Sequence, residues 1–141
     1  MRVVVTGTSG KVGPWVAHEF VAHGWEVLGI DVRPPRQEGF DWIIGDLEDL
    51  GQVYGLFARF RPDAVVHMAA IPWPGGAAPD RVFQLNTRTP YHLLQACADR
   101  GIGKAVTASS ESAYGIVFAR HPFYPRYLPI DEDHPLFPQD P

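Results

Sequence analysis

Three glycines at a fixed spacing lie between a short β-branched run and a stretch with helical periodicity. Gly7, Gly10 and Gly13 follow the run at residues 2–6, and apolar residues with helical spacing come after them. Glycine permits tight-turn dihedral angles and lets one backbone approach another group closely. A second apolar run at 26–31 completes a strand–helix–strand unit of about thirty residues, the size of a parallel crossover. The sequence therefore predicts a βαβ unit with a glycine turn.

The same alternation of element types continues over most of the chain. Strands are expected at residues 41–45, 64–68 and 103–109, and helices at residues 47–60 and 79–100. Strands that alternate with helices form parallel sheets with right-handed crossovers. The sequence therefore predicts an α/β fold with a doubly wound, parallel sheet of five strands.

Two of the expected helices have apolar positions that predict how they pack. The helix after the glycine turn, which is expected to end at Gly24, has helical spacing at Val12, Trp15, Val16, Glu19, Phe20 and His23. The helix at 79–100 is expected to be apolar along Tyr91, Leu94 and Ala98, with Leu93 and Cys97. Cys97 is expected to be a packing residue, as most free cysteines are.

The composition excludes several classes of protein. The chain has 141 residues, 45% of them hydrophobic, and a net charge of −4, which is typical of a soluble globular domain. It has no basic run for nucleic acid or for a membrane surface, and no apolar run near the ~18 residues of a membrane span. A single cysteine favours a reducing cytoplasm, and the six histidines lack metal-ligand spacing. We expect a cytoplasmic protein without a metal site.

An acidic residue ends the second expected strand, and its distance in sequence from the glycine turn is typical of a dinucleotide-binding unit. Asp31 comes eighteen residues after Gly13, close to the ~20 of a dinucleotide-binding unit. In such units the pyrophosphate lies at the helix N-terminus and the acid binds the ribose hydroxyls. A glycine triplet alone also occurs in purely structural turns, and Asp31 favours the binding interpretation. NAD is predicted; Arg33 and Arg36, which could accept a 2′-phosphate, leave NADP as the less favoured alternative.

Five motifs stand in the order and at the intervals of a known family. They are the glycine turn of residues 6–13, Gly45-Asp46-Leu47, His67-Met68-Ala69-Ala70, Asn86, and Ser109-Ser110-Glu111-Ser112-Ala113-Tyr114-Gly115. Over the whole chain these motifs resemble the extended short-chain dehydrogenase/reductases, the NAD-dependent epimerase/dehydratase family that includes UDP-glucose 4-epimerase. The resemblance implies a Rossmann-type fold and a nucleotide sugar, or a related polyol or uronate, as the substrate.

The resemblance also implies roles for individual residues. Asp46 and Leu47 would border the adenine, and Ala69 and Ala70 would line the nicotinamide side through their backbone. The implied cofactor-binding set is Gly7, Ser9, Gly10, Lys11, Val12, Gly13, Asp31, Asp46, Leu47, Met68, Ala69, Ala70, Asn86 and Ala108. Ser110 matches the catalytic Ser/Thr that hydrogen-bonds the substrate oxygen. Further substrate-binding candidates are Trp73, Glu111 and Ser112.

Three of these positions also have a structural interpretation. Asp46 could cap the helix that follows it, because Asp is a favoured N-cap residue. His67, at a strand end, is expected to be a hydrogen-bonded core histidine rather than an acid or base. Trp73 follows the fourth expected strand, where ligands of α/β proteins bind, and could stack on a substrate or pack its own loop.

The 141 residues of the sequence do not contain the catalytic pair of the family. Its reaction needs Tyr-x-x-x-Lys on one helix face, where the lysine lowers the tyrosine pKa for proton transfer. Four residues after the five tyrosines stand Ala58, Gln95, Phe118, Leu128 and Asp131. The two lysines, Lys11 and Lys104, lie in the glycine turn and at the fifth expected strand. We therefore expect little or no turnover by this chain.

The end of the chain breaks the alternation of strands and helices. Residues 121–141 contain six prolines and no periodicity, which predicts an irregular tail after a domain at residues 1–120. Residues 129–135 and 138–141 resemble the acidic, proline-rich segment that precedes Tyr-x-x-x-Lys in the family. We expect the N-terminal part of a longer enzyme that self-associates through its uncovered fifth strand and the helix at 91–100. The alternatives are a non-catalytic NAD-binding or NAD-sensing module and an enzyme similar to uronate dehydrogenases.

Overall fold

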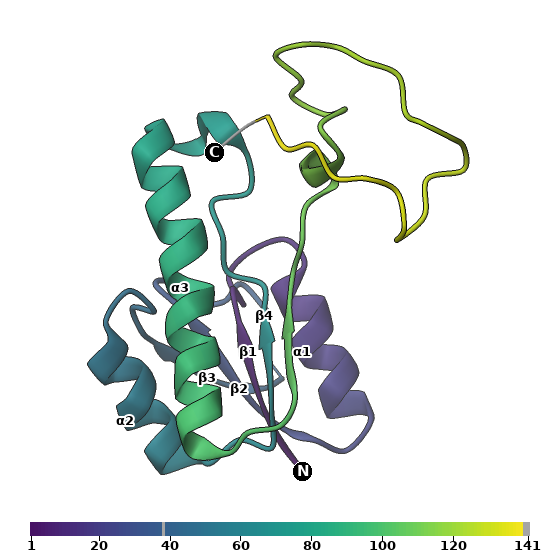
Figure 1. Ribbon diagram of the computed structural model, residues 1–141. Coiled ribbons are helices and arrows are strands. Elements are labelled where there is room, and N and C mark those ends of the chain that lie inside the picture. The colour runs from purple at the N-terminus through teal and green to yellow at the C-terminus, as the bar shows by residue number, and fades with distance from the viewer. Residues whose placement is uncertain (38, 140–141) are drawn as a thin grey trace. The chain divides into compact units, whose positions relative to one another are not determined.

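A parallel sheet is the central element of the computed structural model, which describes residues 1–37 and 39–139. Its five strands are β1 (Arg2–Thr6), β2 (Glu26–Asp31), β3 (Asp41–Ile44), β4 (Ala64–His67) and β5 (Ala105–Thr107). The strands are all parallel and their order is β3-β2-β1-β4-β5 (Figure 1). The strand order reverses at β1, so the sheet is doubly wound and the predicted fold class is confirmed.

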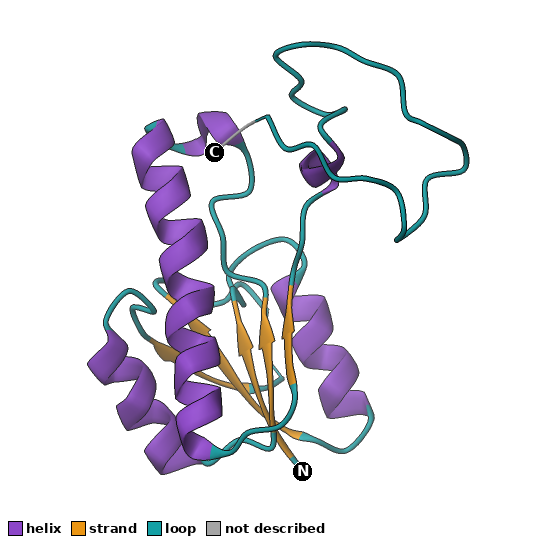
Figure 2. Ribbon diagram, in the orientation of Figure 1, coloured by secondary structure: helices purple, strands orange, loops and turns teal. Residues whose placement is uncertain are grey.

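Helices cover both faces of the sheet (Figure 2). α1 (Gly13–Ala22) packs on one face, where Val3, Val5 and Val66 form a buried cluster with Ala17. α2 (Leu50–Phe60) and α3 (Pro79–Arg100) pack on the other face, where the buried cluster is Val4, Leu28, Ile30, Leu47, Val53, Phe57, Val65, Leu93, Ala96 and Cys97. Successive residues of β1 therefore supply opposite cores, as expected of a strand buried on both faces. Among the described residues, none of the helices has the length and apolar character needed to cross a membrane.

The chain divides into two compact units. The first consists of Met1–Ala70 and Gln84–Ala108, and it holds the sheet, α1, α2 and residues 84–100 of α3. The second consists of Ile71–Phe83 and Ser109–Pro141, with the short 3₁₀ turns η1 (Pro74–Gly76) and η2 (Glu111–Tyr114). The sequence predicts a boundary at residue 120, whereas the unit that contains the tail begins at Ser109 and takes in the segment Ile71–Phe83.

The proline-rich tail is irregular, as predicted, but hydrogen bonds hold it within the second unit. Up to residue 139 it contains neither helix nor strand, and its last two residues lie outside the described part of the chain. The backbone N–H of Phe137 donates to the carbonyl of Ala113 at 2.9 Å, and the Gln139 side-chain amide donates to the carbonyl of Gly115 at 3.1 Å. The imidazole of His134 is buried and accepts from a backbone N–H. The tail and the turn at η2 therefore support each other.

Several expected element ends are corrected by the structure. The helix expected from residue 47 begins at Leu50, because the carboxylate of Asp49 accepts from the backbone N–H of Gln52 at 3.1 Å and caps it. The strand expected at 103–109 is limited to Ala105–Thr107, the residues that pair with β4. The strands expected at 41–45 and 64–68 each end one residue earlier.

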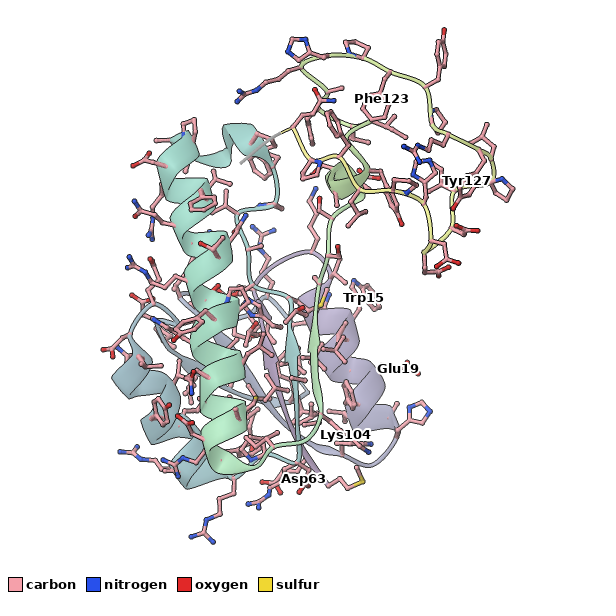
Figure 3. All side chains as sticks on the ribbon, viewed as in Figure 1. Trp15, Glu19, Asp63, Lys104, Phe123 and Tyr127 are labelled. Carbon is pink, nitrogen blue, oxygen red and sulfur yellow. The ribbon has the colours of Figure 1, made fainter. Side chains whose placement is uncertain are left out.

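The faces of two helices also differ from the expectation. Val12 and Trp15, before and within α1, are 54% and 66% exposed, and Figure 3 shows Trp15 on the outer side of that helix. On α3 the expected residues Leu93 and Cys97 are buried, and Ala96 is buried with them, but Tyr91, Leu94 and Ala98 are exposed. Each helix presents only one stripe to the sheet, and the second apolar stripe of each helix faces outward. Cys97 is a packing residue, as predicted.

A pair of glycine substitutions tests how closely the turn after β1 is packed. Gly7 and Gly24 have nearly the same positive φ, +73° and +76°, so Ala at either position costs about 1 kcal/mol in backbone strain. A Cβ at Gly7 would lie 2.7 Å from the backbone N of Ala69, but at Gly24 it would meet nothing within 4 Å. Chemical denaturation should show Gly7→Ala to be less stable than Gly24→Ala by a further ~1–3 kcal/mol. Equal losses would contradict the close packing.

Candidate functional site

The glycine turn connects β1 to α1 at the carboxyl edge of the sheet, where a side chain at two of its glycines would collide with backbone. A Cβ at Gly13 would lie 2.2 Å from the carbonyl oxygen of Gly7, and one at Gly7 would collide with Met68 and Ala69. At Gly10 the nearest atom would be the Gly7 oxygen at 3.1 Å. The turn is therefore closely packed against backbone at the start of α1.

The first turn of α1 offers backbone donors at the glycine turn, except at Pro14, which has no N–H. Its N-cap residue is Val12, whose side chain has no polar atom and makes no capping hydrogen bond. The first N–H groups of a helix lack intrahelical acceptors and carry the positive end of the helix dipole. This end of α1 is therefore suited to an anion, and the exposed Lys11 adds a positive charge beside it.

Asp31 ends β2 beside the glycine turn. The backbone N–H of Ser9 donates to the Asp31 carboxylate at 2.9 Å, and the Ser9 hydroxyl donates to the carbonyl of Arg33. The two bonds tie the turn to the end of β2 and fix the direction of the carboxylate. Asp31 is half-buried, so its carboxylate keeps access to solvent.

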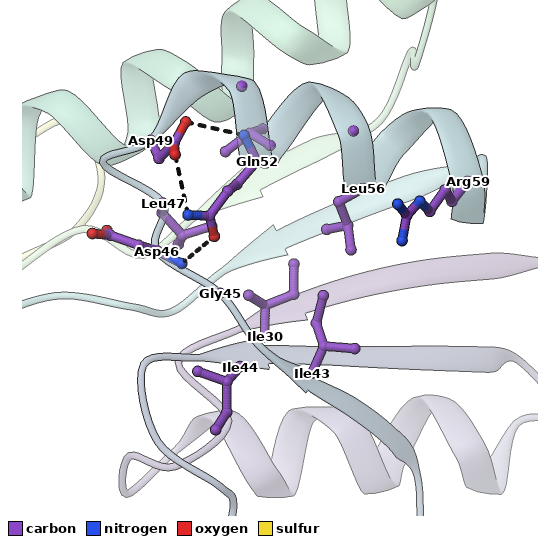
Figure 4. Close-up of a pocket in the computed structure, with 13 residues that line it drawn as sticks. Ile30, Ile43, Ile44, Gly45, Asp46, Leu47, Asp49, Gln52, Leu56 and Arg59 are labelled. Carbon is purple, nitrogen blue, oxygen red and sulfur yellow. Dashed lines mark hydrogen bonds between the residues drawn. The ribbon is translucent and has the colours of Figure 1, made fainter.

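A cavity of about 480 Å³ lies between α2 and the end of β3 (Figure 4). Asp46 and Leu47 line one end of it, and Ile43, Leu56 and Arg59 line the other parts. The Asp46 carboxylate accepts from the backbone N–H of Glu48 at 2.9 Å, so it forms a local turn. The suggestion that Asp46 caps the helix is wrong, because Asp49 does so.

At the end of β4 a buried histidine joins two threonines. The Nδ1 atom of His67 lies 2.7 Å from Thr6 Oγ1, and its Nε2 atom lies 3.2 Å from Thr89 Oγ1 on α3. Thr6 Oγ1 also accepts from the backbone N–H groups of Met68 and Ala69, at 3.1 and 3.2 Å. His67 is 5% exposed, and burial lowers its pKa to about 4. The predicted hydrogen-bonded core histidine is confirmed.

The carboxyl edge of the sheet brings the expected cofactor residues of the first unit together. The glycine turn follows β1, Asp31 ends β2, and the segments 46–47 and 68–70 follow β3 and β4. Ala108 follows β5, and its N–H donates to the carbonyl of His67 at 2.9 Å. Asn86 lies on α3 rather than at a strand end.

The expected substrate residues belong to the second unit. Ser110 is the N-cap of η2, and its Oγ accepts from the backbone N–H of Ser112 at 3.2 Å and lies 2.8 Å from Ser112 Oγ. Glu111 is exposed in the first turn of η2, and Ser112 is buried. Trp73 directly precedes η1 and is 53% exposed, with its ring beside Gly76, which leaves both of its interpretations open.

Residues 3–138 match the NAD dependent epimerase/dehydratase family. The chain belongs to this family. UDP-glucose 4-epimerase of Lactobacillus helveticus is 32% identical to this chain over an alignment that spans all of this chain and 42% of that enzyme. UDP-glucose 4-epimerase of Azospirillum brasilense is 31% identical over 99% of this chain and 40% of that enzyme.

Solved structures of epimerase/dehydratase relatives share the fold. UDP-glucose 4-epimerase from Brucella ovis, in complex with NAD, is 25% identical and superposes with a TM-score of 0.85 over 99% of this chain and 42% of its own. A short-chain dehydrogenase/reductase superfamily protein from Agrobacterium tumefaciens, with bound NAD, is 33% identical, with a TM-score of 0.82 over 99% and 40% of the two chains. The chain thus spans less than half the length of these relatives.

The structure of this epimerase/dehydratase chain also shows polar residues that sequence reasoning missed. Thr6, Thr89 and His92 bond to the ends of β3 and β4 or to the residues that follow them. In the sequence, Thr6 resembles any other β-branched residue of a strand, and Thr89 and His92 follow no periodic pattern. The sequence contains no signal that could have paired Thr89 with His67.

The pH dependence of stability tests the burial of His67. The unfolded chain protonates this imidazole near pH 6.5 and the folded chain only near pH 4, so the unfolded state holds more protons between these values. Stability therefore falls as the pH is lowered through this window, by about 3 kcal/mol at pH 4. Denaturant unfolding between pH 7 and 4 should show this additional loss in wild type relative to His67→Gln. Parallel pH profiles of the two proteins would contradict it.

Proposed function

We propose that the first unit is the NAD site of an epimerase/dehydratase enzyme that acts on a nucleotide sugar or a related sugar. The observation that carries the proposal is the closely packed glycine turn between β1 and α1, to which the Asp31 carboxylate is hydrogen-bonded. Pyrophosphate requires close approach to backbone N–H groups, and an adenosine ribose requires an acceptor at the end of β2. Both requirements are met within the first unit.

The described residues fit the parts of NAD in chain order. Gly7, Gly10 and Gly13 with the start of α1 would hold the pyrophosphate, because the tight turn that these glycines allow lies at the helix N-terminus. Asp31 would accept from the ribose hydroxyls, and Asp46 with Leu47 would border the adenine. The cavity beside β3 supports this placement of the adenine. When bound, NAD supplies a hydride acceptor that can also return the hydride.

Asp31 also favours NAD over NADP. Its carboxylate would repel a 2′-phosphate at the ribose that it binds. Arg33 and Arg36 are exposed on the segment after β2, where a phosphate could reach them, but it is the carboxylate of Asp31 that bonds to the glycine turn through the backbone N–H of Ser9. The expected preference is therefore for NAD.

Ser110 is proposed to hydrogen-bond the substrate oxygen that undergoes oxidation. The two serine hydroxyls of η2 lie 2.8 Å apart, and when Ser112 is the donor the Ser110 proton is available to a substrate. The 141 residues contain no Tyr-x-x-x-Lys pair that could take the hydroxyl proton as the hydride leaves for NAD. We therefore propose that this chain alone binds NAD without turnover; a rate comparable to that of an intact family enzyme would contradict this.

A second candidate function needs only the NAD site. A non-catalytic module that binds or senses NAD needs the glycine turn and Asp31 but no proton donor. Both candidates predict NAD binding by the first unit, and only the enzyme predicts that Ser110 matters. A chain extended by a family Tyr-x-x-x-Lys region would separate them, because Ser110→Ala lowers turnover only in an enzyme.

Self-association is proposed through the outward stripe of α3. Tyr91 and Leu94 are 62% and 46% exposed and lie one helical turn apart. Contiguous apolar surface on a helix is commonly covered by another chain. Sedimentation at high concentration tests this, and a monomer throughout would contradict it.

Calorimetric titration with NAD and NADP tests the proposed site. Wild type should bind NAD more tightly than NADP, and Asp31→Ala should weaken NAD about 10- to 100-fold while leaving NADP unchanged or tighter, because a charge-assisted pair of bonds to the ribose is lost. Asp63→Ala is the matched control: Asp63 bonds the Arg2 N–H at the opposite end of the strands (Figure 3). An equal loss in both variants, or no NAD binding by wild type, would contradict the proposal.

A further inference from the structure

Residues on one side of α3 bond to both segments that flank the proposed NAD site. Thr89 and His92 lie one helical turn apart, so their side chains share a side of the helix. His92 reaches the residues that follow β3, and Thr89 reaches the histidine that ends β4. A single helix is therefore bonded to the expected adenine side and to the expected nicotinamide side.

The contact on the adenine side is direct. His92 Nδ1 lies 2.9 Å from the carbonyl oxygen of Leu47. A carbonyl oxygen can only accept, so Nδ1 carries the hydrogen in this bond. Arg88 forms an ion pair with Glu48 at 3.8 Å, but Arg88 is half-exposed and such pairs contribute little. Two contacts therefore hold Leu47 at α3: the bond between His92 and its carbonyl, and the burial of its side chain in the cluster that contains Leu93.

The contact on the nicotinamide side is a series of hydrogen bonds in which the donor and the acceptor of each bond can be assigned. Thr89 Oγ1 donates its proton to the carbonyl of Leu85 at 3.0 Å, so it accepts from His67 Nε2. The neutral ring then has only an acceptor at Nδ1, and Thr6 Oγ1 donates its proton there. This leaves the lone pairs of Thr6 for the N–H groups of Met68 and Ala69. Each donor in the series has one acceptor, so the order is fixed.

We propose that α3 positions the two halves of the NAD site separately. His92 sets the backbone of residues 45–47 at the adenine, and Thr89 sets that of residues 68–70 at the nicotinamide side by acting through His67 and Thr6. Neither residue touches the cofactor, so both are positioning residues. The inference rests on the proposed NAD site and assigns a separate positioning residue to each half of it.

Titration of two ligands separates the halves. ADP carries the adenosine and the pyrophosphate but lacks the nicotinamide, so it reports on the adenine side alone. Thr89→Val, which keeps the shape and removes the hydroxyl, should weaken NAD about three- to ten-fold and leave ADP unchanged. Thr89→Ser, which keeps the hydroxyl, should bind both ligands like wild type.

The second pair of variants should give the opposite pattern. His92→Phe keeps a ring and removes the donor, and it should weaken ADP and NAD by the same factor, about three- to ten-fold. His92→Asn places an amide donor near the position of Nδ1 and should restore both affinities. Thermal unfolding of all four variants shows whether each is folded.

The direction of the hydrogen bonds on the nicotinamide side can be tested in the wild-type chain, because it fixes the tautomer of His67. The long-range ¹⁵N–¹H spectrum of the wild-type imidazoles at pH 7 should show His67 as the neutral Nε2–H tautomer. The Nδ1–H tautomer would overturn the inference, as would equal losses of NAD and ADP in Thr89→Val or unchanged binding in both Thr89→Val and His92→Phe. Absence of NAD binding by wild type would instead overturn the proposed function, and the inference with it.

Discussion

The close approach of the β1–α1 turn to the chain that leaves β4 is the contact on which the site depends. With Gly7 at a φ of +73° and no Cβ at Gly13, the turn folds onto itself and against residues 68–69. β1 is the middle strand of the sheet, so this contact sets where α1 starts and where the neighbouring strands end relative to it. A Cβ at Gly7 would collide with residues 68–69 and one at Gly13 would collide with Gly7, so a side chain at either glycine would distort the turn that the proposed cofactor needs.

Hydrogen bonds then hold the strand ends in place around that turn. Ser9 bonds to Asp31 at the end of β2, and Thr6 bonds to His67 and to the N–H groups that follow β4. His67 is buried and neutral because burial lowers its pKa, so it acts as a fixed connector rather than as an acid or base. Thr6 and His67 therefore help to organise the site although neither belongs to the expected cofactor-binding set.

The sequence predicts the sheet and the cofactor residues because both leave local patterns. β-branched runs that alternate with helical stretches indicate a parallel sheet, and glycines followed by an acid at the next strand end indicate a dinucleotide site. Helix faces were harder to predict: α3 has two apolar stripes, and only contact with the sheet decides that Leu93 is buried and Tyr91 exposed. The same limit applies to Asp46 and Asp49, which are both reasonable caps, and only Asp49 accepts from the first turn of α2.

Long-range polar contacts could not be predicted at all. The bond between Thr89 and His67 joins residues that no periodicity relates, and the order of the tail comes from single bonds such as that from Phe137 to Ala113. A proline-rich segment contains no repeating signal from which such bonds could be inferred.

A backbone amide NMR titration of the ¹⁵N-labelled chain with NAD tests most directly whether the carboxyl edge of the sheet is the cofactor site. The shifts should concentrate in residues 7–13, at Asp31 and in residues 68–70, and amides at the opposite end of the strands, such as Asp63 and Lys104, should stay in place. Unchanged spectra at saturating NAD, or shifts centred on the opposite end, would contradict the assignment of this edge.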